Sequence, residues 1–221
     1  MTISNDQDSR PRRRYAPRLP PERRRAQLLD AAFEVLARDE LHELSMEAVA
    51  RAAGVGKPVL YTVFRTRSDL VAALLTRERE DAIKQVRETM PTDLRDLGPT
   101  AAYAATVSAF VRIVLENPTR WRLILAMPES APREYREDLR ISRAGILAEA
   151  ETLARAGISL EPRLAGLDPA LLAQTMLSFA EMLGRLAVTD PEIYTSDRLS
   201  QFANAFIATI ARPVPQTDAE S

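Results

Sequence analysis

The sequence contains no cysteine and a single histidine, His42. Disulfide frameworks, thiolate metal sites, cysteine nucleophiles and multi-histidine metal centres are therefore excluded. His42 falls near an expected loop, where an isolated histidine is most often solvated. We expect neither a bound metal nor another cofactor, because the side chains that catalytic sites most often use are nearly absent.

Long apolar runs are also missing from the sequence. The N-terminus lacks the apolar run of about 7 to 15 residues that follows the charges of a signal peptide. No stretch approaches the roughly 18 apolar residues that a membrane-spanning helix needs. These absences predict a soluble, cytoplasmic protein without a membrane partner.

The charge is distributed unevenly along the 221 residues, although the net charge is only −1. Residues 1–77 hold 14 basic and 10 acidic side chains, whereas residues 78–221 hold 16 and 21. The chain is long enough for a small domain plus a mid-sized one. A basic first part on an acidic remainder is typical of a DNA-binding head on a body that does not bind DNA, although many enzymes share such an offset.

Both ends of the chain are predicted to be disordered. Residues 1–20 show no helical period and contain three prolines and five arginines. They form either an inert solvated tail or a basic arm that lies along DNA phosphates or in the minor groove. Residues 213–221 are a short polar tail.

Three short helices are predicted over residues 21–75. Pro21 suits the first turn of a helix that should end near residue 38. Ser45 is a good N-cap for the second helix, and Gly54 suits the left-handed position that ends it. Two short helices joined by a glycine turn, with another helix starting directly afterwards, are the outline of a DNA-reading helix-turn-helix.

The helix after the turn is confined to residues 57–64, because Pro58 is tolerated only in a first turn. Leu60 and Phe64 lie four residues apart and should face the other two helices. The residues turned outward are then Lys57, Val59, Tyr61 and Thr62. A solvated helix would carry Glu, Lys and Gln there, whereas small apolar, hydroxyl and basic groups suit thymine methyls, base edges and phosphates.

Every later segment is predicted to be helical, so the fold class is all-α. A long fourth helix, capped by Ser68 and Asp69, should run to about residue 90 and leave the head as a connector. Arg67 beside its start is well placed to hold a phosphate. The body, residues 76–212, continues with helices over 100–117, 118–126, 132–156, 169–188 and 196–212. The total is about nine helices.

A recognisable set of residues runs through the head. It comprises Phe33, Ser-Met-Glu-Ala-Val-Ala at 45–50, Ala-Gly-Val at 53–55, Leu-Tyr-Thr-Val-Phe at 60–64, Arg67 and Leu70. This set, within residues 24–75, resembles the DNA-binding head of the TetR family of bacterial transcriptional regulators. Two positions depart from the family pattern: Gly56 stands where serine is commonest, and Thr62 stands where an aromatic residue or histidine is frequent.

The resemblance implies a regulator rather than an enzyme. It implies that Lys57, Tyr61 and Arg67 hold phosphates and that Pro58, Val59 and Thr62 lie nearest the bases. Ser45 and Met46 complete the predicted DNA-binding set. In the body, the resemblance extends only to the all-helical layout and to short fragments such as residues 117–121.

In this family the body dimerises through its last two helices and holds a small-molecule pocket. Aromatic and methionine side chains suit such a pocket, and its predicted lining is Tyr103, Phe110, Trp121, Met127, Met176 and Phe179. The predicted dimer contacts are Leu183, Leu186, Phe202, Phe206 and Ile210. Ordinary core packing is the alternative for each of these residues. Glu181 either selects a cationic ligand or pairs with Arg185, four residues further on.

These features together predict a homodimeric, ligand-responsive transcriptional repressor. It would bind a near-palindromic DNA operator and be released by a small, largely hydrophobic or aromatic effector. Two alternatives from other classes are an all-helical ligand-binding or scaffold protein without DNA affinity, and a helical-bundle enzyme.

Overall fold

The computed structural model of the protein describes residues 19–126 and 131–210. These residues form nine α-helices and one 3₁₀ turn, η1. The elements in chain order are α1 (Pro21–Leu36), α2 (Met46–Ala52), α3 (Lys57–Val63), α4 (Arg67–Thr89), α5 (Pro99–Glu116), α6 (Pro118–Leu125), α7 (Arg133–Leu160), η1 (Pro162–Leu164), α8 (Pro169–Thr189) and α9 (Ser196–Ile210). The all-α prediction with about nine helices is confirmed. Most of the predicted arm, Met127 and the C-terminal tail lie outside the described residues.

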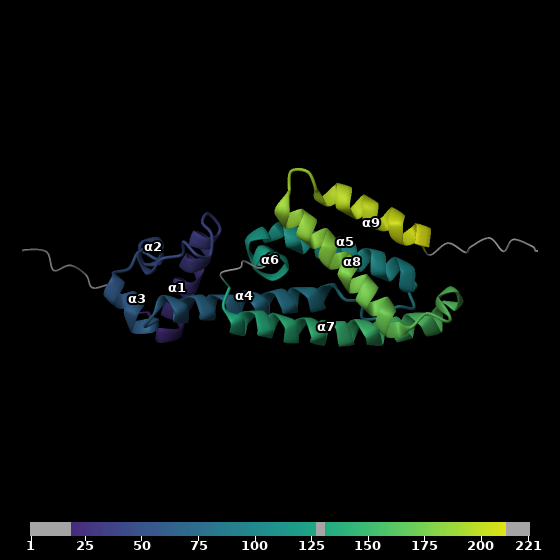
Figure 1. Ribbon diagram of the computed structural model, residues 1–221, viewed down its shortest axis with the longest axis horizontal. Coiled ribbons are helices and arrows are strands. Elements are labelled where there is room, and N and C mark those ends of the chain that lie inside the picture. The colour runs from purple at the N-terminus through teal and green to yellow at the C-terminus, as the bar shows by residue number, and fades with distance from the viewer. Residues whose placement is uncertain (1–18, 127–130, 211–221) are drawn as a thin grey trace, which may run out of the picture.

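The molecule is elongated, with a head at one end and a larger body at the other (Figure 1). Helices α1, α2 and α3 form the head, and α4 runs from the head into the body. Helix α7 lies beside α4, α8 packs across α5, α6 and α7, and α9 packs on α5. The chain therefore places its N-terminal head and its last two helices far from each other.

Local signals at helix ends are mostly where the sequence places them. The Ser45 hydroxyl accepts a hydrogen bond from the Ala48 N–H at 3.1 Å, and Gly54 has a φ of 64° after the end of α2. The cap predicted for α4 is wrong. Thr66, rather than Ser68, is the N-cap, and it exchanges hydrogen bonds with Asp69 in a reciprocal capping box.

Helix α7 was expected to end near residue 156 but continues to Leu160. Gly157 would normally weaken a helix at this point. Here it is buried against the start of α5, where a Cβ on Gly157 would lie 3.2 Å from the Pro99 Cβ. Packing against α5 accounts for the extra turn.

Two apolar cores share α4. We call the first of them the head cluster, because it forms the core of α1–α3. It includes Leu28, Leu60 and Phe64 together with Leu70 and Leu74 from the first half of α4. It also includes body residues from and near α6 and α7: Leu123, Ala131 and Tyr135. The body cluster starts at Ala82 of α4 and continues through α5, α6, α8 and α9. The predicted division at residue 75 thus falls inside one continuous helix whose two halves belong to different cores.

Helix α8 departs from the expectation that no segment could span a membrane. It is long and apolar enough to do so by length and composition alone, and it is the one such helix among the residues described. It packs against α5, α6 and α7, and 28% of its most apolar 18-residue stretch is buried there. The core helix of a folded body meets the same two criteria, so this observation is weak evidence for a membrane span.

Helix α8 approaches α5 and α6 most closely at Gly184. A Cβ there would lie 2.6 Å from the Leu125 Cδ1 and 2.9 Å from the Phe110 Cε1. We predict that Gly184→Val lowers the free energy of unfolding by about 2 kcal/mol, because a tightly packed site must open to admit it. Urea denaturation followed by circular dichroism measures the change.

Gly145→Val is the matched control, because Gly145 is a helical glycine of α7 with nothing within 4 Å of its added Cβ. It should change the free energy of unfolding by no more than about 0.5 kcal/mol. Equal effects of the two substitutions would contradict the close packing of α8.

Candidate DNA interface and internal cavity

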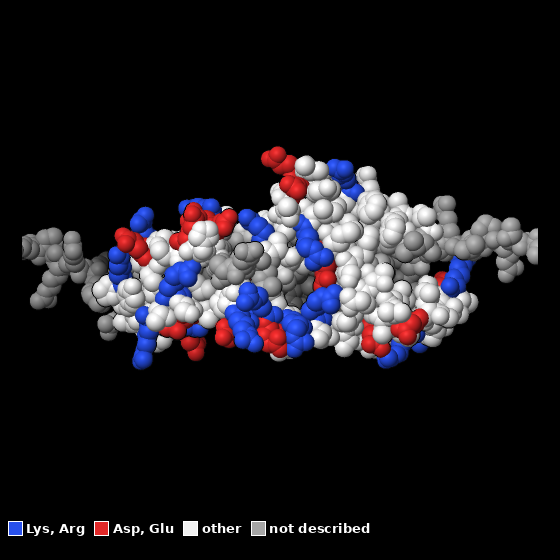
Figure 2. All heavy atoms as spheres, viewed as in Figure 1, with Lys and Arg blue, Asp and Glu red and all other residues white. Residues whose placement is uncertain are grey.

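The outward face of α3 has the composition that the sequence predicts. Leu60 is fully buried and Phe64 is 2% exposed, and both belong to the head cluster. The exposed residues of α3 are Lys57, Pro58, Val59, Tyr61 and Thr62. Basic side chains project from the outer end of the head, where α2 and α3 lie (Figure 2). The head therefore presents α3 away from the body.

Two contacts from α1 fix the orientation of this face. The Gln27 side-chain amide donates a hydrogen bond to the Ala53 carbonyl at the end of α2, at 3.0 Å. The Arg25 guanidinium lies 4.8 Å from the centroid of the Phe64 ring, within the range of a cation–π interaction. Both contacts restrict how α2 and α3 can turn on α1.

Lys57, a predicted phosphate ligand, already has an anionic partner. Its Nζ lies 2.8 Å from a Glu47 carboxylate oxygen on α2. The hydrogen bond and charge of Lys57 lower the pKa of Glu47. Both side chains are exposed, so a DNA phosphate would compete with this carboxylate for the ammonium group.

Thr62 and Val59 stand next to each other on the exposed face. The Thr62 hydroxyl donates a hydrogen bond to the Val59 carbonyl at 2.7 Å. Its proton is therefore engaged, while its oxygen lone pairs and methyl group remain outward. Val59 and Tyr61 are 38% and 48% exposed. Val59 and Thr62 therefore offer an acceptor and apolar groups, while the exposed hydroxyl of Tyr61 can donate as well as accept.

The two predicted DNA ligands at the start of α2 differ in exposure. Ser45 is exposed, and its oxygen caps the helix. Met46 is 9% exposed and packs in the head cluster. The apolar side chain of Met46 therefore contributes to the core, and a role of Met46 at DNA stays a prediction. Only its backbone N–H, in the first turn of α2, could face an anion.

The guanidinium of Arg67 already donates hydrogen bonds to backbone carbonyls of the head. Its Nε donates to the Leu44 carbonyl at 2.6 Å, and its Nη2 donates to the carbonyls of Leu41 and His42 at 2.6 and 3.3 Å. Arg67 thus holds the loop between α1 and α2 against the start of α4. Its role as a phosphate ligand stays a prediction, to which the structure adds this positioning role.

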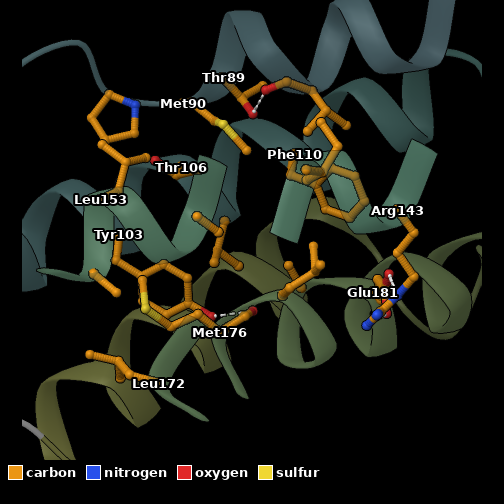
Figure 3. A pocket seen from close by; sticks show the side chains of 18 of the residues that line it. Thr89, Met90, Tyr103, Thr106, Phe110, Arg143, Leu153, Leu172, Met176 and Glu181 are labelled. Atoms are coloured by element: carbon orange, nitrogen blue, oxygen red, sulfur yellow. Dashed lines mark hydrogen bonds and ion pairs between the residues drawn. The ribbon is translucent and has the colours of Figure 1, made fainter. Parts of the chain in front are cut away.

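A cavity of about 420 Å³ lies inside the body (Figure 3). Its walls come from α4, α5, α6, α7 and α8, with Ile207 from α9. Four residues of the predicted lining do line it: Tyr103, Phe110, Trp121 and Met176. Phe179 does not, because its ring stacks on Phe206 of α9 with centroids 5.1 Å apart.

Polar groups in the cavity wall are few, and most of their protons are engaged. The Tyr103 hydroxyl donates to the Met176 carbonyl at 2.7 Å, and burial raises the pKa of Tyr103. The hydroxyls of Thr89, Thr106 and Ser142 likewise donate to backbone carbonyls. The charged lining residues are Arg79, Arg143 and Glu181.

Glu181 pairs with a different arginine from the one expected. Its two oxygens accept hydrogen bonds from Nε and Nη2 of Arg143, on α7, at 2.7 and 3.0 Å. The predicted pair with Arg185 is wrong, because Arg185 is exposed whereas Glu181 faces the cavity. The bonds join α7 to α8 across the cavity wall.

An apolar face is left uncovered on α8 and α9. Phe202 and Phe206 are 51% and 42% exposed and stack with centroids 5.8 Å apart. Leu186 is half-buried. Leu183 is 1% exposed within its own protomer, so the prediction that it forms a dimer contact is wrong. The side chain of Ile210 lies outside the described residues. Much of this part of the body shows neither acidic nor basic groups in Figure 2.

A buried carboxylate that the sequence reading missed connects the head with the body. Glu78 of α4 has no exposed surface, and it accepts hydrogen bonds from Arg77 at 2.9 Å and from Arg120 of α6 at 2.8 Å. Arg77 also reaches Asp30 of α1 at 2.6 Å. The signal was present in the sequence, because Glu78 continues the helical spacing of Leu70 and Leu74.

Comparisons with known proteins agree with this geometry. Residues 28–74 match the family model described as bacterial regulatory proteins, tetR family. The HTH-type transcriptional activator FasR of Mycolicibacterium smegmatis is 36% identical over 107 residues, which cover 48% of each chain. The fatty acid metabolism regulator protein of Bacillus subtilis is 29% identical over 62 residues, 28% of this chain and 32% of that protein. The chain thus aligns with about half or less of each of these curated relatives.

A solved structure shares the fold over most of the chain. The transcriptional regulator FadR from Bacillus subtilis, in complex with stearoyl-CoA, superposes with a TM-score of 0.65 and 18% sequence identity. The match covers 86% of this chain and 98% of that one. At this identity the likeness shows a common fold that includes both head and body.

We predict that Lys57→Ala weakens binding to duplex DNA of any sequence. Loss of one phosphate contact should reduce the slope of log affinity against log salt by about one. Fluorescence anisotropy with labelled duplexes over a salt series measures this slope. Arg140→Ala, which removes an exposed arginine of α7, is the control and should leave the slope unchanged. An unchanged slope in Lys57→Ala would rule out the phosphate contact.

Proposed function

We propose that the chain is a transcriptional regulator of the tetR family, whose model residues 28–74 match. It binds a near-palindromic operator as a homodimer in the cytoplasm, through the exposed face of α3. A long-chain acyl effector in the body cavity changes its DNA affinity. The observation that carries the proposal is a rigidly held α3, exposed at the outer end of the head, on an α4 that also forms the cavity wall.

The exposed side chains of α3 fall into two sets, one suited to DNA phosphates and one suited to bases. Lys57 and Tyr61 lie at positions suited to phosphates, with Ser45 at the start of α2 beside them. Val59 and Thr62 offer a methyl-bearing edge with one acceptor, which suits thymine methyl groups and base amino groups in the major groove. Pro58 keeps the first turn of α3 free of an N–H that would need a partner.

Dimerisation through α8 and α9 is supported by their uncovered apolar face. Phe202 and Phe206 each expose about half of an aromatic ring that would be buried in a seam between two copies. Leu186 lies along the same pair of helices. To bind DNA, such a dimer must set its two α3 helices about 34 to 36 Å apart, as adjacent major grooves on one face of DNA require. An operator of two inverted half-sites follows from this symmetry.

The cavity and the structural relative both support an acyl effector. The cavity wall is almost entirely apolar, and Tyr103, Phe110 and Met176 contribute to it. Such a wall favours a flexible aliphatic chain over a polar metabolite. The FadR structure from Bacillus subtilis holds stearoyl-CoA, and we propose an acyl-CoA or a related acyl compound for this cavity.

The coupling runs from the cavity through α6 to the head. Trp121 lines the cavity, its neighbour Arg120 holds buried Glu78, and Leu123 packs in the head cluster. The Tyr135 hydroxyl of α7 donates to the Leu123 carbonyl at 3.4 Å. An effector that prefers a shifted α6 would therefore act on α4 and on the spacing of the two heads. The change in DNA affinity is limited to its differential affinity for the two states.

We propose that the effector releases the operator, which makes the protein a repressor. The relative from Mycolicibacterium smegmatis bears the name of an activator. The experiment below therefore measures whether the effector lowers or raises the affinity for DNA. The match of residues 28–74 to the tetR-family model favours a regulator over the two alternatives, an enzyme and a scaffold without DNA affinity.

Selection of random duplexes by the purified full-length protein tests the proposal. We expect an enriched inverted repeat with half-site centres about one helical turn apart. Stearoyl-CoA should then lower the affinity for that repeat, whereas coenzyme A alone should not. Absence of an enriched repeat at moderate salt would contradict operator binding. A repeat whose binding ignores stearoyl-CoA would contradict the effector class alone, and tighter binding would reverse the assignment as a repressor.

The role of Glu78 in coupling has its own test. Glu78→Gln leaves two arginines facing a neutral amide in a buried site, and should lower the free energy of unfolding by roughly 3 kcal/mol. It should also reduce the effect of stearoyl-CoA on operator affinity while leaving stearoyl-CoA binding nearly unchanged. Thermal unfolding, calorimetry and anisotropy measure the three quantities.

Glu149→Gln serves as the matched control, because Glu149 bridges α7 to Arg87 of α4 at 2.7 Å on the exposed side. An exposed pair contributes about 0 to 1 kcal/mol, so this variant should retain stability and effector response. A full effector response in Glu78→Gln would show that the buried carboxylate is structural only.

A further inference from the structure

We infer that the cavity selects effectors by an anionic group, which Arg143 and Arg79 hold at one end while Glu181 keeps Arg143 in place. This inference rests on the proposed function of the cavity as an effector site. It adds the chemical class of the effector's polar end and the residues that recognise it.

The charged groups of the lining do not balance. Two arginines stand against one carboxylate, which leaves an excess of one positive charge in an otherwise apolar wall. Asp138 lies 3.9 Å from the Arg79 Nη2, but it is 47% exposed and does not line the cavity. A solvated carboxylate at that distance neutralises Arg79 only weakly. An uncompensated positive charge in an apolar wall favours an anionic ligand.

The donors that remain available in the wall are the two arginines, the Thr100 hydroxyl and the buried Trp121 Nε1, which has no hydrogen-bond partner among the described residues. Tyr103, Thr89, Thr106 and Ser142 direct their hydroxyl protons to backbone carbonyls. Arg79 donates to the Ser142 oxygen at 3.0 Å, and its buried Nε has no hydrogen-bond partner among the described residues. The guanidinium of Arg143 carries more N–H donors than its two bonds to Glu181 use. An acceptor group on a ligand would find its donors here.

Glu181 acts as a positioning residue in this arrangement. Its carboxylate is 17% exposed and grips Arg143 through two parallel hydrogen bonds. A forked pair of this kind fixes the plane of the guanidinium. Arg143 itself is 38% exposed, so its remaining donors can meet a ligand without loss of the pair.

The cavity gives such a ligand a direction. Figure 3 places Arg143 and Glu181 at one end, with Tyr103, Met176 and Leu172 at the other. The wall at the other end is completed by apolar side chains of the loops before α5 and α8, among them Leu94, Leu164 and Leu167. An amphipathic molecule would place its anionic group at the arginines and its aliphatic chain along the remaining wall.

The test compares three ligands that share a ten-carbon chain: decanoate, decanoyl-CoA and 1-decanol. Calorimetry with the full-length protein gives the affinity for each. We expect the wild type to prefer decanoate over 1-decanol by about 10-fold, as one charge-assisted contact provides. Arg143→Met should reduce this preference to near parity. If Arg143→Met loses affinity for decanoate alone, the site recognises a free carboxylate. If it loses affinity for decanoyl-CoA equally, the site also recognises the phosphates or thioester of an acyl-CoA.

Arg140→Met is the matched control. Arg140 is another α7 arginine in a forked pair with a carboxylate, that of Glu137, but it lies in solvent outside the cavity wall. It should retain the wild-type preference. Three outcomes would each overturn the inference. They are equal affinities of the wild type for decanoate and 1-decanol, an unchanged preference for decanoate in Arg143→Met, and a preference that falls as much in Arg140→Met as in Arg143→Met.

Glu181→Gln keeps the test decisive if Arg143→Met fails to fold. The substituted side chain keeps one oxygen that can accept from Arg143 and hold it in place, but the negative charge is lost. The preference for decanoate over 1-decanol should therefore rise several-fold, because Arg143 then lacks an anionic partner. If the pair of Glu181 with Arg143 only stabilises the fold, the substitution should change the affinities for decanoate and 1-decanol equally. That outcome would overturn the inference. Failure of all three ligands to bind the wild type would instead overturn the proposed acyl effector, and with it this inference.

Discussion

The structure depends on one continuous helix that belongs to two cores. The first half of α4 buries Leu70, Leu74 and Leu75 in the head cluster, and its second half turns Ala82 into the body cluster and several side chains into the cavity wall. An α-helix is stiff over this length, because each turn is held by its own backbone hydrogen bonds. Any ligand that moves the second half must therefore move or tilt the first.

Glu78 stands at the point where the two halves of α4 meet. A buried carboxylate costs free energy unless charged partners and hydrogen bonds compensate for its lost hydration. Here Arg77 and Arg120 provide that compensation, and they tie α1 and α6 to the same turn of α4. The head cannot rotate freely on the body without breaking this set of charged hydrogen bonds. In the proposed function, these bonds would transmit a change in α6 to the head.

The sequence predicted the helices well because their ends carry local signals. Prolines at helix starts, Ser45 at an N-cap and Gly54 with its positive φ act within a few residues of themselves. The cap of α4 was misplaced because Ser68 also suits a cap, whereas the reciprocal pair of Thr66 and Asp69 decides the position. Here the pattern of a capping box was available in the sequence and was overlooked.

The site was predicted less completely, because its remaining features depend on contacts between distant segments. Helical spacing gives the face of α8 on which Phe179 lies, but not whether α9 or the cavity meets that face. The partner of Glu181 is 38 residues away on α7, so a rule for neighbours four apart selected Arg185 instead. Met46 and Leu183 were assigned to surfaces, yet tertiary packing buries both.

The pair of Lys57 with Glu47 has a consequence for how the protein searches DNA. An ammonium group that already has an anionic partner gains less from an arbitrary phosphate, since it must exchange one partner for another. In the proposed binding mode, the head would therefore leave unrelated DNA quickly and stay longer where Val59 and Thr62 also contact bases. The carboxylate of Glu47 would then shorten the residence time on unrelated DNA, at some cost to the affinity for the operator.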